Sequence, residues 1–213
     1  ITDFTAGSHN LSLQTGESQW NNVSLQATSA DITVNSVLDI RNSAAEASDI
    51  TITASHLITD ADTWIGSDNS QVVVTNLTNN GTLLSAEKLQ INAEGSINNQ
   101  GRLASFSDLG ISASDITNSG LVTSQDLSLN GSTIDNTGDI SAEALDITYQ
   151  EFTNQSGASL VADRAAYRAA DNSAFFANYG EQVAASAVQW LKSGFADNSG
   201  SYINGGKLQG NAL

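Results

Sequence analysis

Four consecutive segments repeat one pattern: LTNNGTLLSAEKLQINAEGS from Leu77, INNQGRLASFSDLGISASD from Ile97, ITNSGLVTSQDLSLNGST from Ile116, and IDNTGDISAEALDITYQE from Ile134. Each has an apolar residue, then an Asn, then a Gly, and later Leu-x-Ile or Leu-x-Leu. Because side chains of a strand alternate between two faces, the x-separated apolar pair predicts a strand with one buried side. A repeat of about 20 residues built from such strands is typical of one β-helix turn.

The same apolar pair recurs along the rest of the chain. Degraded copies that start at Phe152, Phe176 and Phe195 supply Ala165 with Tyr167, Val188 with Trp190, and Leu208. Before the regular repeats, the pairs are Leu11 with Leu13, Ile32 with Val34, Ile50 with Ile52, and Val72 with Val74. Treated as one column, these pairs predict an all-β parallel β-helix, a solenoid of about eleven rungs of roughly 20 residues each. We expect irregular rungs in 1–76, regular repeats in 77–151, and degenerate rungs with an insertion in 152–213.

Three sets of repeat positions have predicted structural roles. Leu89, Leu109, Leu127 and Leu145 should form one vertical column in the core. The recurrent asparagines should hydrogen-bond along the axis as an amide ladder; these are Asn79, Asn99, Asn118, Asn136 and Asn154. The glycines two residues later should make bends with positive φ; these are Gly81, Gly101, Gly120 and Gly138.

Composition and charge exclude several classes of protein. Seven Lys and Arg against 23 Asp and Glu give a net charge of -16, which would repel nucleic acid and anionic lipid. No Cys is present, so disulfides and thiolate metal sites are excluded. The sequence has no long apolar run that would span a membrane and no signal peptide, so we expect a fragment of a larger secreted protein. A leucine-rich repeat is disfavoured because its signature is missing.

The sequence offers little catalytic chemistry. His9 and His56 are isolated, and carboxylates on neighbouring rungs, such as Asp108 with Asp126 or Asp126 with Glu143, are expected to be solvated residues. Asp60, Asp62 and Asp68 form the densest acidic group, but their spacing matches no calcium motif. We therefore predict no catalytic residues, no cofactor and no metal.

Two longer rungs carry the candidate partner-binding residues, because irregular insertions on solenoids often contact partners. The first, Thr59 to Ser70, places Trp64 beside Asp60, Asp62 and Asp68; the second, Arg164 to Tyr179, holds Arg164, Arg168, Phe175 and Tyr179. Tyr167 and Phe176 fall on repeat positions and are expected in the core. For Trp64, Arg168 and Phe175, core packing and partner contact both stay open. Val183, Ala187 and Leu191 have helical spacing, so a short helix packed on the rod is an alternative there.

The motifs N-x-G-x-L-x-S and L-x-I, as in NNGTLLSAEKLQI and NQGRLASFSDLGI, resemble the haemagglutinin repeats of filamentous haemagglutinin-type exoproteins. That group includes the contact-dependent growth inhibition effectors. The resemblance covers residues 77 to 151 well and the remainder weakly. It implies a right-handed parallel β-helix, secretion by an outer-membrane transporter in a two-partner system, and display as a filament at the Gram-negative cell surface.

The resemblance implies a non-enzymatic filament segment that serves adhesion, or receptor contact and toxin delivery, with a cell-surface protein or glycan as the receptor. The alternative is a carbohydrate-active or glycan-binding β-helix protein. An enzyme should place three or more carboxylates in one groove, whereas a spacer should have evenly spread charge and no cleft. An ice-binding solenoid would need a flat Thr-x-Thr array, and only isolated cases such as Thr51 with Thr53 occur.

Overall fold

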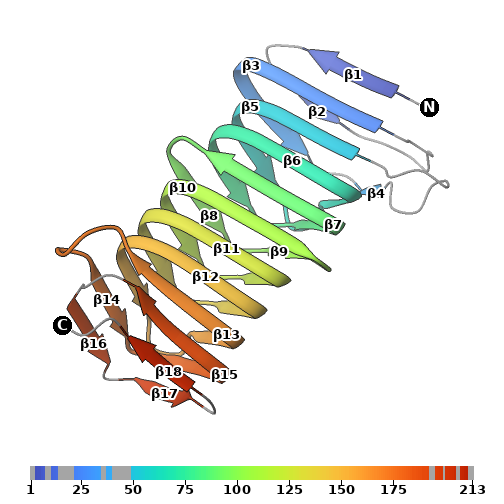
Figure 1. Ribbon diagram of the computed structural model, residues 1–213. Helices are drawn as coiled ribbons and strands as arrows, with labels where there is room; N and C mark the ends of the chain where they lie inside the picture. The colour runs from blue at the N-terminus through green and yellow to red at the C-terminus, as the bar shows by residue number, and fades with distance from the viewer. Residues whose placement is uncertain are drawn as a thin grey trace.

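The computed structural model describes the backbone of residues 3–7, 11–13, 22–34, 37–39, 49–191, 195–198, 200–204 and 207–210, and the side chains of residues 49–190. This described part is all β, and its strands pair in parallel. Figure 1 shows the strands stacked along one axis in chain order, with the two termini at opposite ends of the stack. The predicted all-β parallel solenoid is confirmed.

The strands of the first part are β1 (Asp3–Gly7), β2 (Leu11–Leu13), β3 (Asn22–Val34), β4 (Val37–Asp39), β5 (Asp49–Thr59) and β6 (Trp64–Asn79). The middle part contains β7 (Thr82–Ala93), β8 (Ser96–Asn99), β9 (Arg102–Ser105), β10 (Asp108–Asn118), β11 (Leu121–Asn136) and β12 (Asp139–Asn154). The last part contains β13 (Ser159–Ala169), β14 (Phe175–Asn178), β15 (Glu181–Leu191), β16 (Phe195–Asn198), β17 (Ser201–Asn204) and β18 (Lys207–Gly210).

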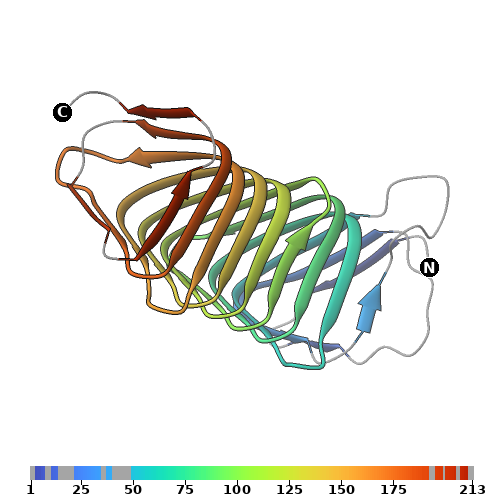
Figure 2. The ribbon, with the colours of Figure 1, turned by 90° about the horizontal axis from the view of Figure 1, so that it is seen from below.

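Each turn contributes one segment to each of three parallel sheets. The long strands bend from one sheet into the next. In the turn made by β11, residues 121–124 belong to the first sheet, 126–131 to the second and 133–136 to the third, as their pairing with β12 shows. Buried and exposed residues alternate, except at the two bends, where Gln125 with Asp126 and Ser132 with Thr133 are all exposed. Two consecutive outward side chains therefore mark a corner, and Figure 2 shows the turns wrapping around the common axis.

The predicted leucine column is confirmed. Leu89 pairs with Leu109, Leu109 with Leu127, and Leu127 with Leu145, and these side chains are at most 3% exposed. The second members of the pairs stack beside them in the same sheet, and the third sheet carries its own apolar column from Leu57 to Phe176. Since burial of one such side chain contributes about 1.5 to 3 kcal/mol, these columns are the main source of stability.

The register of the N-terminal turns differs from the prediction. Ile50 and Val188 occupy the same column, with about seven turns between them. Backbone pairing continues this column to Val23 and Phe4 at one end and to Leu208 at the other. Leu11 pairs with Ile32 and Ile32 with Leu57, in the third sheet, whereas Ile50 pairs with Val23 in the second sheet. Val72 pairs with Ile91, which makes it a second rather than a first member of its pair.

The asparagine ladder is confirmed and is longer than predicted. Asn79, Asn99, Asn118, Asn136 and Asn154 each donate an Nδ2 hydrogen to the Oδ1 of the asparagine one turn further on, over 2.7 to 2.8 Å, and the last acceptor is Asn178. The Nδ2 groups also donate to backbone carbonyls. At the other end, the Thr59 hydroxyl donates to Asn79 Oδ1 over 2.6 Å. These buried amides are therefore satisfied from turn to turn.

The prediction of positive φ for the repeated glycines is wrong. Among the described residues, Gly157 is the glycine with positive φ, at 87°. The repeated glycines instead permit a close approach between turns, because a β-carbon on Gly101 would overlap the carbonyl oxygen of Gly81, and one on Gly120 would overlap that of Gly101. Gly157 lies where the repeat gains two residues, since Asn136 precedes Asp139 by three positions and Asn154 precedes Ser159 by five. Buried Ala158 there takes the place before the first-sheet strand. The glycine motif therefore marks places where the backbones of two turns lie too close together for a side chain, and not a left-handed bend.

Large aromatic side chains fill the core of the last described turns. Phe152 and Phe176 stack with ring centroids 4.7 Å apart, and Tyr167 stacks on Trp190 at 4.5 Å. Tyr167 and Phe176 are buried, as predicted. The hydroxyl of Tyr167 accepts a hydrogen bond from Gln182 Nε2 over 2.7 Å. This bond gives a partner to the buried amide of Gln182, which occupies a first-sheet position that earlier turns fill with aliphatic residues.

The alternative of a short helix through Val183, Ala187 and Leu191 is wrong. These residues belong to strand β15, which pairs with β13 from Ser159 to Arg168. The register shifts between Ala162 and Arg164, so the strand bends at this corner. Two adjacent exposed residues at the bend, Ala185 and Ser186, shift the apolar spacing away from strict alternation, which is why it resembled a helical pattern.

Candidate functional site

An open groove with a volume of about 610 Å³ lies on the second sheet. It crosses the turns of β7, β10, β11, β12, β13 and β15 and therefore runs along the axis of the rod. Its lining side chains come from two outward rows, one directly before the leucine column and one between the two members of each apolar pair. The strand register that stacks the core residues therefore also aligns the outward residues that line the groove.

Small outward residues form the floor of the groove. In the row between the apolar pairs, Gln90 is followed on successive turns by Gly110, Ser128, Asp146, Ala166 and Gln189. In the row before the leucine column, Ala144 and Ala187 lie on either side of Arg164. The groove exists because short side chains occupy places that other turns fill with glutamine or charged residues.

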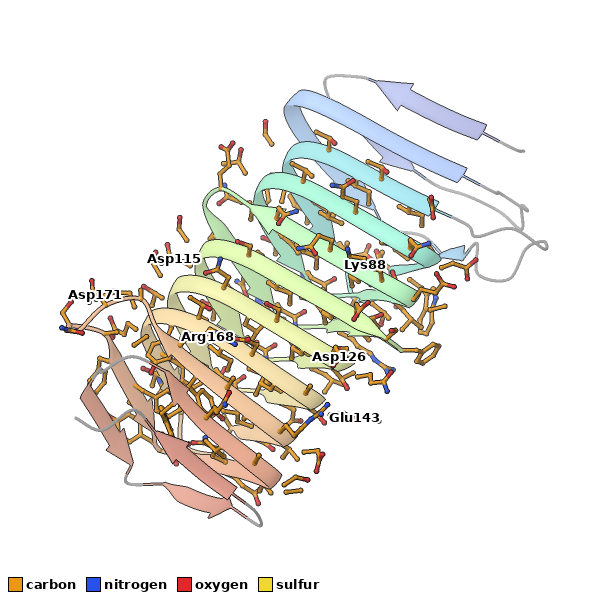
Figure 3. The ribbon with its side chains drawn as sticks, in the orientation of Figure 1. Lys88, Asp115, Asp126, Glu143, Arg168 and Asp171 are labelled. Carbon is orange, nitrogen blue, oxygen red and sulfur yellow. The ribbon has the colours of Figure 1, made fainter. Side chains whose placement is uncertain are left out.

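The row before the leucine column carries four of the charged side chains that line the groove. The row before the leucine column reads Lys88, Asp108, Asp126, Ala144 and Arg164 on five successive turns, so two carboxylates lie between two cations. Neither cation forms an ion pair with another described residue. Figure 3 shows Lys88, Asp126 and Arg168 on this broad face, with Glu143 at one edge and Asp115 and Asp171 at the other.

Arg168 fixes the third carboxylate of the groove. Its Nε lies 2.7 and 2.8 Å from the two carboxylate oxygens of Asp146, and its second guanidinium nitrogen lies 2.7 Å from Oδ2. The hydrogen bond and the charge of Asp146 raise the pKa of Arg168. Since both side chains are partly exposed, this pair orients the carboxylate more than it stabilises the fold.

The carboxylates on neighbouring turns that the sequence analysis considered differ in how directly they are paired. Asp108 and Asp126 pair directly, so their α-carbons are about 4.8 Å apart, the spacing of adjacent strands. Asp126 pairs with Ala144 and not with Glu143, so these two carboxylates are not direct cross-strand neighbours. Glu143 lies one residue earlier, at the corner, where its Oε2 accepts from Gln125 Nε2 over 3.2 Å.

The residues predicted in the first long rung do not form one site. Asp60 closes a turn: its Oδ1 accepts from the backbone N–H of Asp62 and from the Thr63 hydroxyl. Trp64 begins β6 in the first sheet, where it pairs with Thr82 and is half-buried. Asp68 is buried at the next corner, with 9% of its surface exposed. Among the described residues, no three His, Cys, Asp or Glu side chains are arranged to hold a metal ion.

The residues predicted in the second long rung lie on different faces. Arg164 and Arg168 are exposed on the second sheet, and Arg164 lines the groove. Phe175 is half-buried in the third sheet, where it pairs with Glu151, and Tyr179 is 38% exposed at the following corner. A turn at Asp171 links the second and third sheets; hydrogen bonds from the Ser173 hydroxyl and N–H, and from Gln150, lower the pKa of Asp171.

Of the two histidines, His56 lies in the described part of the chain. His56 Nε2 lies 3.0 Å from the Thr78 hydroxyl on the next turn, a partly buried polar contact. His9 lies outside the described residues. The sequence did not single out two exposed hydrophobic side chains: Phe106, which is 63% exposed at the corner before Asp108, and Val73, which is 40% exposed.

The fold defines the class of the protein: it is a parallel β-solenoid. Comparisons of the chain with protein family models, with curated proteins and with solved structures find no match. A search of the described residues finds no helix with the length and hydrophobicity needed to cross a membrane.

Proposed function

We propose that the chain is a non-enzymatic, rigid segment of a large secreted exoprotein displayed at the Gram-negative cell surface, where it holds a receptor-contacting region away from the cell. The observation that carries the proposal is the stack itself: the third-sheet column is apolar on every turn from Leu57 to Phe176, and the amide ladder runs beside it from Asn79 to Asn178. A rod with a continuous core resists bending, because each turn is packed and paired on both sides.

Rigidity and length follow from the same register. Seven or so turns at about 4.8 Å each give a rod of about 34 Å between Ile50 and Val188. Because each turn contacts only its neighbours, further turns of the same kind lengthen the rod without a new core. The sequence resemblance to filamentous exoproteins supports secretion by a partner transporter, and the parallel solenoid is the architecture that such a filament requires.

Removal of one whole turn tests the spacer role. Leu57 and Leu77 occupy equivalent positions on successive turns, so deletion of residues 57–76 should leave the other turns in register. We expect the shortened chain to fold and its rod to lose about 4.8 Å, measured by small-angle X-ray scattering. A deletion of 57–66, about half a turn, is the matched control and should prevent cooperative folding.

The same deletion in the parent exoprotein tests where the function resides. It removes Asp60, Asp62, Trp64 and Asp68 together, so secretion and receptor attachment should persist if these residues belong to a spacer. Protease accessibility on intact cells measures display, and cell attachment measures contact. Loss of attachment by a displayed, folded deletion variant would contradict a spacer role for this turn, and a parent protein that stays inside the cell would contradict the proposal as a whole.

A further inference from the structure

We infer that the groove on the second sheet binds a neutral oligosaccharide that lies along the rod axis. This inference goes beyond the rod proposal, and it stands on the side chains that line the groove. The groove runs from the turn of Lys88 and Gln90 to that of Gln189, and the four steps from Lys88 to Arg164 cover about 19 Å. A linear chain of sugar rings fits a shallow channel of this length.

The floor suits the C–H faces of sugar rings. Ala144, Ala166 and Ala187 present methyl groups that a flat ring can approach closely, whereas the Gln90 side chain covers Gly110. Phe106 lies outside this floor, at the corner two residues before Asp108, where it lines a separate hollow.

The walls suit hydroxyl groups. A sugar hydroxyl both donates and accepts hydrogen bonds, so it needs donors and acceptors side by side. Lys88, Gln90 and Arg164 supply donors, and Asp108 and Asp126 supply acceptors. The pairing of Arg168 with Asp146 holds a further acceptor in place before a ligand arrives, which reduces the entropy lost on binding.

Charge selects a neutral ligand. The three carboxylates of the groove are balanced by Lys88, Arg164 and Arg168, while the whole chain has a net charge of -16. The groove has no excess of positive charge that would attract a polyanion, and the negative charge of the rest of the rod would repel it. A folded protein partner needs about 800 Å² per side with buried aromatic or arginine anchors, and the groove lining contains no aromatic residue.

The test replaces two small residues of the groove floor with glutamine, a residue that the same row already carries on other turns. Ser128 and Ala166 lie in the row of Gln90 and Gln189, so S128Q/A166Q should fold normally and block the floor. T117Q/T153Q is the control, because those threonines occupy one outward row of the third sheet. Circular dichroism and urea unfolding should show that both variants match the parent chain. D108N/D126N, which keeps side-chain shape, is a second groove variant.

Saturation-transfer NMR with neutral hexasaccharides of glucose, N-acetylglucosamine, galactose and mannose serves as the binding assay, and calorimetry gives the affinity. We expect at least one hexasaccharide to bind, S128Q/A166Q and D108N/D126N to weaken binding about tenfold or more, and T117Q/T153Q to leave it unchanged. The inference is overturned if none of the four binds, or if both groove variants bind as tightly as the parent chain. Neither result would alter the scattering measurement that tests the rod, so the two proposals fail separately.

Discussion

Asn118 donates an Nδ2 hydrogen to Oδ1 of Asn136 over 2.8 Å, and the two residues are 18 positions apart in the chain. Both side chains are buried, at 1% and 0% exposure. The bond joins two turns through side chains rather than backbone, and it repeats along the ladder at the same place in each turn. A buried amide in such a ladder depends on both neighbours, since one supplies its acceptor and the other its donor.

Asn118→Ala should destabilise the chain by about 2 to 5 kcal/mol, because it leaves a donor on Asn99 and an acceptor on Asn136 without their partners. Urea unfolding followed by circular dichroism measures the change. Asn130→Ala is the matched control, since Asn130 is exposed on the second sheet, and it should cost no more than about 0.5 kcal/mol. Equal effects of the two substitutions would show that the ladder contributes nothing beyond surface polarity.

Gly120→Ala should destabilise the chain by about 3 kcal/mol or more, because its β-carbon would overlap the backbone of the preceding turn at Gln100 and Gly101. The backbone there cannot move away cheaply, since Leu121 N–H donates to the Gly101 carbonyl over 2.9 Å. Gly157→Ala meets no neighbouring atom and should cost only about 1 to 2 kcal/mol for its positive φ. Urea midpoints rank the two variants, and the reverse order would refute crowding as the reason for the repeated glycine.

Stability should fall at alkaline pH because of Tyr149. Burial raises the pKa of this phenol from 10.0 to about 12 in the folded chain. The neutral form is favoured in the fold, so its contribution is fully present below pH 10 and is lost as the pH rises through 12. Two pKa units correspond to about 2.7 kcal/mol as an upper estimate. Urea unfolding from pH 9 to 12 should show a smaller loss for Tyr149→Phe than for the parent chain; identical profiles would contradict this assignment.

The pair of Arg168 and Asp146 should add little stability in spite of its short contacts. The two side chains are 45% and 39% exposed, so water and salt screen their attraction. A double-mutant cycle with Arg168→Met and Asp146→Asn should give a coupling of about 0.2 to 1 kcal/mol, and less in 1 M NaCl. A larger, salt-independent coupling would mean that the pair is a structural element of the rod.

The sequence was sufficient for the core of the regular repeats, because their turns are nearly equal in length. Leu89 and Leu109 could be aligned by spacing alone, and Asn79 and Asn99 followed from the same frame. The N-terminal register could not be read in this way. Apolar pairs occur in both the second and the third sheet, and spacing does not reveal to which of them Ile32 belongs.

The groove escaped detection in the sequence because small residues define its floor. Gly110 and Ala166 attract no notice as single residues, and they acquire meaning only when their turns are stacked against Gln90 and Gln189. The predicted contact residues were chosen instead for size and charge, and the fold distributes Trp64, Arg164 and Phe175 over three different sheets. Sheet assignment was thus the missing physical information.

The amide ladder has a direction. From Thr59 onwards, each group offers its hydrogen to the turn that follows and its oxygen to the turn that precedes it, except that the Thr59 oxygen accepts from the backbone of Asn80 and Gly81. The rod therefore has a head and a tail. A further turn inserted in the same sense continues the series, whereas a turn in the opposite sense would set oxygen against oxygen. Buried side chains thus give these turns the same direction as the parallel strands that carry them.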